Sequence, residues 1–417
     1  MTGIWTWNFQ QLRKRIWFPI AIFGVLGVLT AFAAVWLKPL VPPDLPRLIG
    51  SESVSTLLNI LATSMLAVTT FSVSIMVSAF NAAANNATPR ATVLLRDDGV
   101  TQGVLASFTG AFIYSLCGII GLQTGIYQRS GRLVLFVVTI VVLAIIIWQL
   151  VHWIGHLSNY GRLTDITDRL ETAATKSLAK QMKQPYLGGL RPEPDLAARL
   201  ATGTALPAAT IGYVQFVDME SLQSCAEKAG ATIFVAALPG AFVDPQRDLL
   251  HLIGGTLTDD LAQSLRDAFV VDTQRTFDQD PRFGLIVLAE VASRALSPAI
   301  NDPGTAIDIL GRLQRILSLW HDQPDHEVLF DRIIVGGLVI DDLFADAFAP
   351  IARDGATLVE VQIRLQKVLH ALARLNPDQF ARPAAEQSRR ALAFADTALV
   401  LAADRALVAD LSRQIAP

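Results

Sequence analysis

Long apolar runs alternate with short polar segments along the first third of the chain. Four runs stand out, each roughly 19–24 residues long. At about 1.5 Å per residue, a helix of that length crosses a hydrocarbon core about 30 Å thick, and it satisfies its own backbone groups where water is absent. Four such runs in close succession argue against buried helices of a water-soluble protein. The pattern therefore predicts transmembrane helices at residues 16–37, 57–80, 104–122 and 133–153.

After residue 156 the pattern becomes that of a globular protein. The helical period of residues 157–184 predicts a helix that continues the fourth span, and the prolines and glycines of 185–194 predict a linker. A small α/β unit follows, with strands expected at 211–217 and 232–238 around a helix at 219–229. Further along we expect a strand start at 240–243, a helix start at Thr258, a strand within 328–339, and helices at 283–296, 303–320, 341–352, 358–375 and 383–415.

These patterns predict an integral membrane α-helical bundle of four transmembrane helices, joined to a mostly helical C-terminal soluble domain of the α/β or α+β class. The expected parts are a transmembrane domain at residues 1–156, a connecting helix and linker at 157–194, and a soluble domain at 195–417. Basic residues cluster at 13–15, before the first span, and again after the fourth span. Because loops rich in lysine and arginine stay inside, both termini and the soluble domain are expected in the cytoplasm.

Composition narrows the range of partners. Only 17% of the 417 residues are charged, against about 25% in an average soluble protein, and the deficit lies in the predicted membrane part. The lipid bilayer is therefore an expected partner. The net charge of −3 gives no basis for nucleic-acid binding, so we expect none.

Signatures of catalysis and of metal binding are missing from the sequence. It contains no phosphate loop, dinucleotide fingerprint, nucleophile elbow or zinc-protease motif. Cys117 and Cys225 form no metal-ligand spacing. His152 and His156 share a helix face, but no third ligand follows at a recognisable spacing. We therefore expect no enzymatic activity, no metal and no cofactor.

A stripe of small and polar residues follows one face of the second apolar run. Its members recur at steps of three or four, so they share one helix face. In a membrane such a face either lines a hydrated path or lets another helix approach closely through hydroxyl bonds. Its continuation past the run, at Asn81 and Asn85, favours the mouth of a pore. The candidate pore-lining or helix-interface residues are Thr63, Thr70, Ser74, Ser78, Asn81 and Asn85, with Ala67 among them on the stripe.

A proline-rich segment at residues 294–306 is the most distinctive part of the expected soluble domain. Its sequence, R-A-L-S-P-A-I-N-D-P-G-T-A, predicts a corner between two helices, because prolines lack a backbone donor and restrict their neighbours. Asn301 or Asp302 can cap the second helix, with Pro303 in its first turn. Two interpretations remain open: a rigid structural corner, or a ligand pocket in which an arginine and the helix start contact an anion. The candidate residues are Arg294, Ser297, Asn301, Asp302 and Thr305.

This corner resembles the hallmark of the predicted bacterial membrane proteins called domain of unknown function 2254. The similarity covers nearly the whole chain, with a mild departure at Thr88, where that family usually has serine. The resemblance implies a multi-pass protein of the bacterial cytoplasmic (inner) membrane, and it implies no activity. Other matching pieces are Arg275 with Asp280, which join the candidate site residues, residues 212–215 with Asp218, and residues 240–243, 88–90 and 112–116.

Two classes of function follow from these features. The first is a homo-oligomeric channel or transporter with a cytoplasmic domain for assembly or gating, which the polar stripe favours. The four apolar runs contain no Asp, Glu, Lys or Arg, which argues against a proton-coupled pump but not against a passive pore. The second is a membrane-anchored sensor or ligand-binding module without transport, which the α/β unit and the corner favour. Neither class specifies the ion or small ligand.

Overall fold

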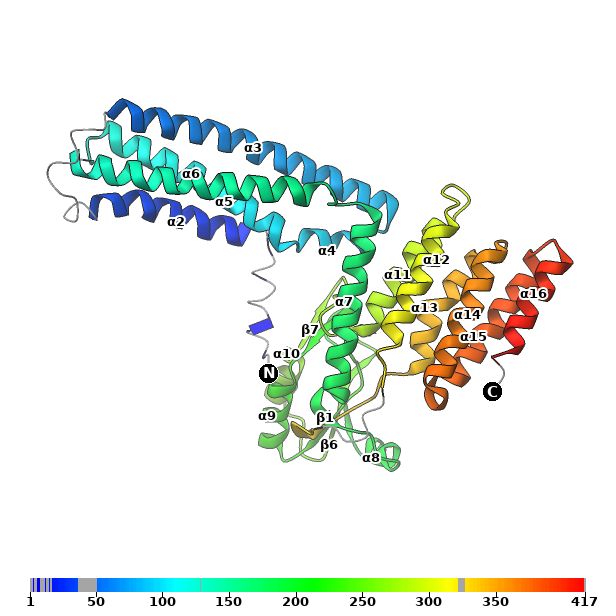
Figure 1. Cartoon of the computed structure of the whole chain (residues 1–417). Helices are drawn as coiled ribbons and strands as arrows, with labels where there is room; N and C mark the ends of the chain where they lie inside the picture. The colour runs from blue at the N-terminus through cyan, green and yellow to red at the C-terminus, as the bar shows by residue number, and fades with distance from the viewer. Residues whose placement is uncertain are drawn as a thin grey trace. The chain divides into compact units, whose positions relative to one another are not determined.

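The computed structural model describes residues 17–36, 51–127, 129–321 and 327–415, together with residues 3, 6, 7, 12 and 15. The chain divides into two compact units. The N-terminal unit comprises residues 8–85 and 89–166, and the C-terminal unit comprises residues 1–7, 86–88 and 167–417. Figure 1 shows the order of the elements along the chain by colour.

Apolar helices make up the N-terminal unit and lie side by side along their lengths (Figure 1). They are α2 (Trp17–Trp36), α3 (Ser51–Asn86), α5 (Gly99–Gln123) and α6 (Arg129–Leu157), and the short α4 (Thr92–Arg96) precedes α5. Three stretches are long and apolar enough to cross a membrane: Ser53–Asn86, Thr92–Gln123 and Gly131–Leu157. Residues Trp17–Ala33 of α2 form a shorter apolar helix. The chain thus has at least three candidate spans among its described residues, and the predicted fourth crossing stays a prediction.

Glycines allow α2 and α5 to approach each other closely. A Cβ atom on Gly27 would lie 2.6 Å from the carbonyl oxygen of Gly110, and one on Gly110 would lie 2.9 Å from the carbonyl oxygen of Phe23. Small residues permit such backbone contact in lipid, where no hydrophobic force drives helices together. A Cβ atom on Gly99 or Gly103 would meet nothing within 4 Å. The close crossing therefore lies at the middle of α5 and not at its start.

Polar side chains inside this bundle bond across helices. Tyr114 on α5 hydrogen-bonds Thr139 on α6 at 2.9 Å. The indole of Trp153 on α6 donates to the hydroxyl of Ser72 on α3 at 3.0 Å. Because an unsatisfied polar group is costly where water is absent, these bonds favour one arrangement of the helices.

The predicted continuation of the fourth apolar helix into the next helix is wrong. α6 ends at Leu157, and α7 spans Leu163–Lys183. Between them Gly161 has a φ of +77°, and a Cβ atom there would lie 2.7 Å from the Cβ of Ala79 on α3. Glycine adopts this left-handed conformation without steric cost, so the chain turns here between the two helices.

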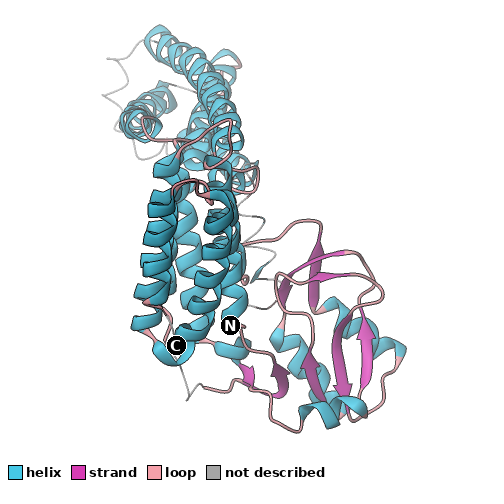
Figure 2. Ribbon diagram, turned by 90° about the vertical axis from the view of Figure 1, so that its right-hand side faces the viewer, coloured by secondary structure: helices cyan, strands magenta, loops and turns pink. Residues whose placement is uncertain are grey.

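Two small sheets form the α/β part of the C-terminal unit (Figure 2, magenta). Their strands are β1 (Gly189–Leu190), β2 (Thr204–Pro207), β3 (Gly212–Val217), β4 (Thr232–Val235), β5 (Phe242–Val243), β6 (Asp248–Ile253), β7 (Phe269–Asp272) and β8 (Phe330–Val335). One sheet has the order β1-β8-β4-β6-β2, and the other has the order β5-β3-β7. Strand β8 runs parallel to β1 and β4, and the remaining pairs are antiparallel.

Short helices connect these strands, and an apolar core lies beneath them. The helices are η3 (Pro185–Gly188), α8 (Leu196–Ala201), α9 (Met219–Ala229) and α10 (Asp259–Asp267). Leu222 of α9, Ile233 of β4 and Ile333 of β8 are each fully buried in one cluster. The predictions of the helix at 219–229, the helix start at Thr258 and the strands at 211–217 and 232–238 are confirmed, the second strand ending at Val235.

The rest of the C-terminal unit is helical. Its helices are α11 (Pro281–Ala295), α12 (Pro303–Leu317), α13 (Ile340–Asp354), α14 (Val359–Leu375), α15 (Pro377–Ala398) and α16 (Ala402–Arg413). A single helix at 383–415 was a wrong prediction, since the chain turns between α15 and α16. The turn folds α16 back so that Ala395, Leu399 and Val408 bury one another.

Candidate functional site

The polar stripe of α3 lies on the face that this chain leaves uncovered. The opposite face packs into the bundle through Leu58, Leu61 and Met65, none of which exposes more than 4% of its surface. The stripe is therefore not a packing seam within one copy of the chain. Its exposed members are Thr63, Ala67, Thr70, Ser74, Ser78, Asn81 and Asn85.

Hydroxyl groups on the stripe donate to their own helix. Thr70 donates to the carbonyl oxygen of Leu66 at 2.9 Å, and Ser74 donates to that of Thr70 at 3.0 Å. Thr63 donates in the same way to Asn59 at 2.9 Å. Each bond occupies the single proton of the hydroxyl and leaves oxygen lone pairs available. These three hydroxyl groups therefore present uncharged hydrogen-bond acceptors to their surroundings.

The exposed face of α6 provides a comparison within the same bundle. It carries large apolar side chains, among them Val141, Ile145 and Ile147, each exposed over about half of its surface. α3 also exposes apolar residues, such as Phe71, but the stripe interrupts them. Lipid tails offer no hydrogen bond to an acceptor, whereas water or another helix does. The two faces thus suit different surroundings.

The two histidines near the end of α6 each contact another side chain of the protein. Nε2 of His156 lies 2.9 Å from Oδ2 of Asp98, which caps α5 by accepting from the Thr101 amide at 2.8 Å. The His152 ring stacks on Trp148 with 6.0 Å between the ring centroids. In the part of the chain that the structure describes, no group of three or more His, Cys, Asp or Glu could hold a metal ion.

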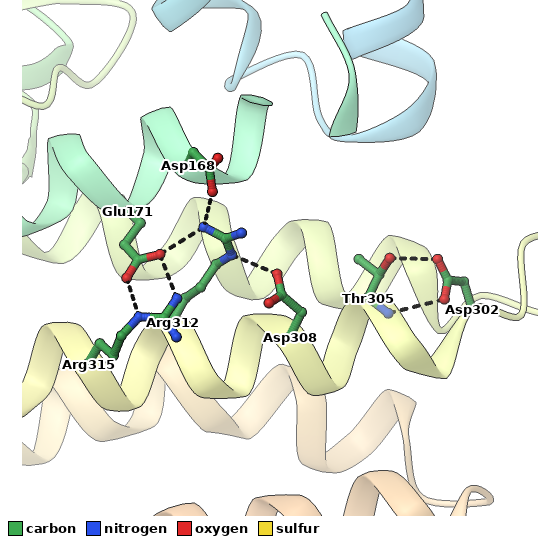
Figure 3. Close-up of polar contacts among 7 residues, drawn as sticks. All are labelled: Asp168, Glu171, Asp302, Thr305, Asp308, Arg312 and Arg315. Carbon is green, nitrogen blue, oxygen red and sulfur yellow. Dashed lines mark hydrogen bonds and ion pairs between the residues drawn. The ribbon is translucent and has the colours of Figure 1, made fainter. Parts of the chain in front are cut away.

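The proline-rich corner connects α11 to α12 through a compact turn. The carboxylate of Asp302 accepts from the amide and the hydroxyl of Thr305 at 3.1 and 2.5 Å (Figure 3). These hydrogen bonds hold the pKa of Asp302 below its ordinary value. Asn301 has a φ of +49°, which asparagine tolerates better than most residues, and the Asp302 amide bonds to the Ala295 carbonyl oxygen at 2.8 Å. The predicted cap at Asp302 is confirmed.

Arg294 and Ser297 lie at the end of α11. The Ser297 hydroxyl donates to the carbonyl oxygen of Arg294 at 2.7 Å. Nε of Arg294 is buried and has no hydrogen-bond partner among the described residues. Local side-chain bonding thus accounts for Ser297, Asp302 and Thr305, Asn301 provides the left-handed turn, and Arg294 keeps a buried donor without a partner among the described residues.

Arg275 and Asp280 form a separate pair at the opposite end of α11. Arg275 Nε donates to the Asp280 carboxylate at 2.7 Å, and Asp280 also accepts from the Phe283 amide at 3.1 Å. Burial raises the pKa of Asp280, while the Arg275 bond and the amide oppose that change. The 15 residues of α11 extend about 22 Å. The pair and the corner therefore belong to two places and not to one pocket.

A cluster of ion pairs between α7 and α12 was missed by sequence reasoning (Figure 3). Arg312 exposes only 7% of its side chain, and its Nη1 lies 2.6 Å from Asp168 and 2.7 Å from Glu171. Its Nε lies 2.7 Å from Asp308, one helical turn away. Arg315 contacts Glu171 at 2.6 Å, and this hydrogen bond holds the pKa of Glu171 below its ordinary value.

The cluster attaches α7 to the helical part of the C-terminal unit. A second contact reinforces it, because a Cβ atom on Gly284 of α11 would lie 2.9 Å from the Cα of Ala174 on α7. The spacing of Asp308 and Arg312 is visible in the sequence as a pair on one helix face. Asp168, however, is 144 residues from Arg312, and no local pattern connects them.

A bundle of long apolar helices joined to a mostly helical unit with two sheets defines this chain as an α-helical membrane protein. Residues 13–371 match the family described as predicted membrane protein (DUF2254), and the chain belongs to that family. The resemblance seen in the corner is thereby confirmed.

Relatives in mycobacteria share part of the chain. It is similar to the uncharacterized proteins Mb1321c of Mycobacterium bovis and Rv1290c of Mycobacterium tuberculosis, with 31% identity over 242 residues in each case. Each match covers 53% of this chain and 44% of the relative. The chain therefore spans less than half the length of the relatives that it matches. No solved structure matches.

Proposed function

We propose that copies of this chain assemble in the bacterial cytoplasmic membrane and form a passive channel, with the outward face of α3 around the shared axis. In this proposal α2 is a fourth crossing, and both termini lie in the cytoplasm. The C-terminal unit serves assembly or gating and has no enzymatic role.

The observation that carries the proposal is the exposure of the polar stripe on α3. One copy of the chain covers the apolar side of this helix and leaves the side with Thr70, Ser74 and Ser78 open. The outward face of the neighbouring α6 carries large apolar side chains, which suit contact with lipid. A face of acceptors is better matched by water or by another copy of α3. An axis shared among several copies provides both.

The stripe also suggests how such a channel would select what passes. Residues 53–86 contain no charged side chain, so selectivity would depend on diameter and on hydroxyl or amide oxygens. At about 1.5 Å per residue, the 36 residues of α3 extend about 54 Å, well beyond a hydrocarbon core of about 30 Å. Asn81 and Asn85 would then lie at a wet mouth of the pore.

A membrane-anchored sensor without transport is the second candidate. The observation that favours it is the ion cluster of Arg312, which attaches α7 to α12. Because α7 is the first helix after α6 in the chain, a movement of the C-terminal unit would be passed on through it. In this alternative, α3 contacts a partner helix and no water path exists.

Electrical recording separates the two candidates. The purified full-length chain in planar lipid bilayers is expected to show discrete conductance. Ser74→Leu should reduce it, because leucine narrows the path and removes an acceptor. Val141→Leu, on the exposed apolar face of α6, is the matched control and should leave the conductance unchanged.

Two results would contradict a channel lined by α3. One is reproducible electrical silence of protein that is folded and inserted. The other is an equal response to Ser74→Leu and Val141→Leu, which would show that the α3 stripe has no special part in conduction. The first result would favour the sensor, and the second would exclude α3 as the lining of the path.

A further inference from the structure

A cavity of about 190 Å³ lies in the C-terminal unit at the end of α7. The last turns of α7, the junction of β3 with α9, and the start of β8 form most of its wall. Its volume corresponds to roughly six water molecules at about 30 Å³ each, and drug-sized sites measure about 300–1,000 Å³. A ligand that fills this cavity is therefore a small metabolite.

The floor of the cavity is apolar and aromatic. Phe216, Met219 and Phe330 line it and are 2–7% exposed. Trp7 stacks on Phe216 with 5.3 Å between the ring centroids, so the ring of Phe216 is supported from another side. Such a floor favours an apolar group of the ligand.

One buried polar group in the wall lacks a bond within the protein. Ser177 on α7 lines the cavity and is 5% exposed. Its Oγ has no hydrogen-bond partner in the described ranges of the chain. Because buried hydroxyl groups are nearly always satisfied, this one indicates a polar atom of a bound molecule.

Charges of both signs stand at the rim, on different elements. Lys180 on α7 and Glu220 on α9 both line the cavity and are exposed. The surrounding protein partly shields the Lys180 ammonium group from water, which lowers its pKa. The nearby carboxylate of Asp278 partly opposes that change. Asp218, although it lines the cavity, caps α9 by accepting from the amide and hydroxyl of Ser221. The rim thus offers one ammonium group and one carboxylate to a ligand.

We propose that this cavity binds an amino acid with an apolar side chain. The ligand carboxylate contacts Lys180 and the Ser177 hydroxyl, its ammonium group contacts Glu220, and its side chain lies on Phe216 and Phe330. All of these residues belong to the C-terminal unit, so binding here is independent of whether α3 lines a pore. The ligand contacts α7, the helix that the chain forms directly after α6.

Calorimetry on the full-length chain in detergent tests this assignment. L-Leucine is expected to bind saturably. The two comparison ligands are 4-methylpentanoate, which lacks the ammonium group, and 3-methylbutylamine, which lacks the carboxylate. Each should bind about ten-fold more weakly or worse, since each loses a charge-assisted hydrogen bond. Either one binding as tightly as L-leucine would overturn the assignment.

Variants place the ligand in this cavity. Lys180→Met should weaken L-leucine binding about ten-fold or more. Lys183→Met, on the same helix but outside the lining, is the matched control and should bind like the wild type. Thermal melting without ligand verifies that both variants are folded. If a variant does not fold, the comparison of the three ligands on the wild type still tests the proposal. Wild-type affinity in folded Lys180→Met, or no saturable binding of L-leucine, L-valine or L-methionine to the wild type, would refute the proposal.

Discussion

Gly240 holds its loop against the buried pair of Arg275 and Asp280. Its φ is +91°, and a Cβ atom there would lie 2.6 Å from Cγ of Asp280 and 2.8 Å from Nη2 of Arg275. An added methyl group would therefore displace a buried ion pair as well as strain the backbone. Gly230 offers a contrast, because its φ is +60° but a Cβ atom there would meet nothing within 4 Å.

We expect Gly240→Ala to lower the free energy of unfolding by at least about 3 kcal/mol, the cost of separating a buried pair. Gly230→Ala should cost only the strain of a left-handed residue, about 1–2 kcal/mol. Chemical denaturation of both variants in the same detergent measures the difference. Equal losses would show that the contact with the pair does not matter.

The cap at Asp302 makes stability depend on pH. Its pKa is lowered in the folded chain, so its contribution is present above the ordinary aspartate pKa of about 3.9 and is lost as pH falls through the lower folded value. Asp302→Ala should cost about 0.5–2 kcal/mol at pH 7, and the difference from the wild type should shrink below about pH 4. Asp302→Asn keeps an acceptor and should cost less at pH 7. Melting curves from pH 7 to below about pH 4 measure the stability loss caused by Asp302→Ala. A loss that stays the same over this range would disprove the cap.

Predicting these residues from the sequence succeeded where the chemistry is local. Asn301 or Asp302 was predicted as the cap, because a short polar residue before proline at a helix start is a short-range signal, and the structure has Asp302 in that place. The separation of Arg275 from Arg294 follows from the helix predicted at residues 283–296, which α11 confirms. The pairing of Arg312 with Asp168 depends on how α12 packs against α7, which no short pattern encodes.

The close crossing of α2 and α5 depends on Gly27 and Gly110, which sequence patterns did not single out. Gly110→Ala would bring a Cβ atom to 2.9 Å from the Phe23 carbonyl oxygen and force the two helices apart. We expect this change to cost about 1–3 kcal/mol, as overpacking typically does. Gly103→Ala, in the same helix with open space around it, should be neutral or stabilise by up to about 1 kcal/mol. Thermal unfolding in detergent compares the two, and a Gly110→Ala protein as stable as Gly103→Ala would contradict the crossing.

Elements with strong local signals were predicted well. α9 begins after its cap at Asp218 and ends at Gly230, which is left-handed, so both boundaries were visible in the sequence. The strands β2, β6 and β7 were not predicted, because each is stabilised by strands that are distant in the chain, and β2 and β7 have only four residues each. The break at Gly161 and the turn after α15 follow from packing against Ala79 and from burial of Leu399. At both positions the helical spacing of apolar residues continues, so the sequence did not indicate where the helix ends.

The sequence predicted the order of apolar helices followed by a mostly helical part with some sheet. Apolar length alone located the helices of the N-terminal unit, since a membrane imposes a minimum length on each crossing. The spacing of small and polar residues at steps of three or four located the stripe on α3. It could not reveal which way the stripe points, because that depends on whether Leu58 and Met65 on the other face pack into the bundle. Their burial turns the stripe outward, and this is the basis of the proposed channel.

The reaction of single cysteines with a charged, water-soluble thiol reagent tests the surroundings of this face most directly. In a background with Cys117→Ser and Cys225→Ser, Thr70→Cys places a thiol on the stripe and Val141→Cys places one on the apolar face of α6. A thiol reacts as the thiolate, which forms in water and not among lipid tails. In native membranes the account predicts rapid labelling at position 70 and none at position 141. Position 70 as unreactive as position 141, in protein that is inserted and folded, would contradict a water-filled path along α3.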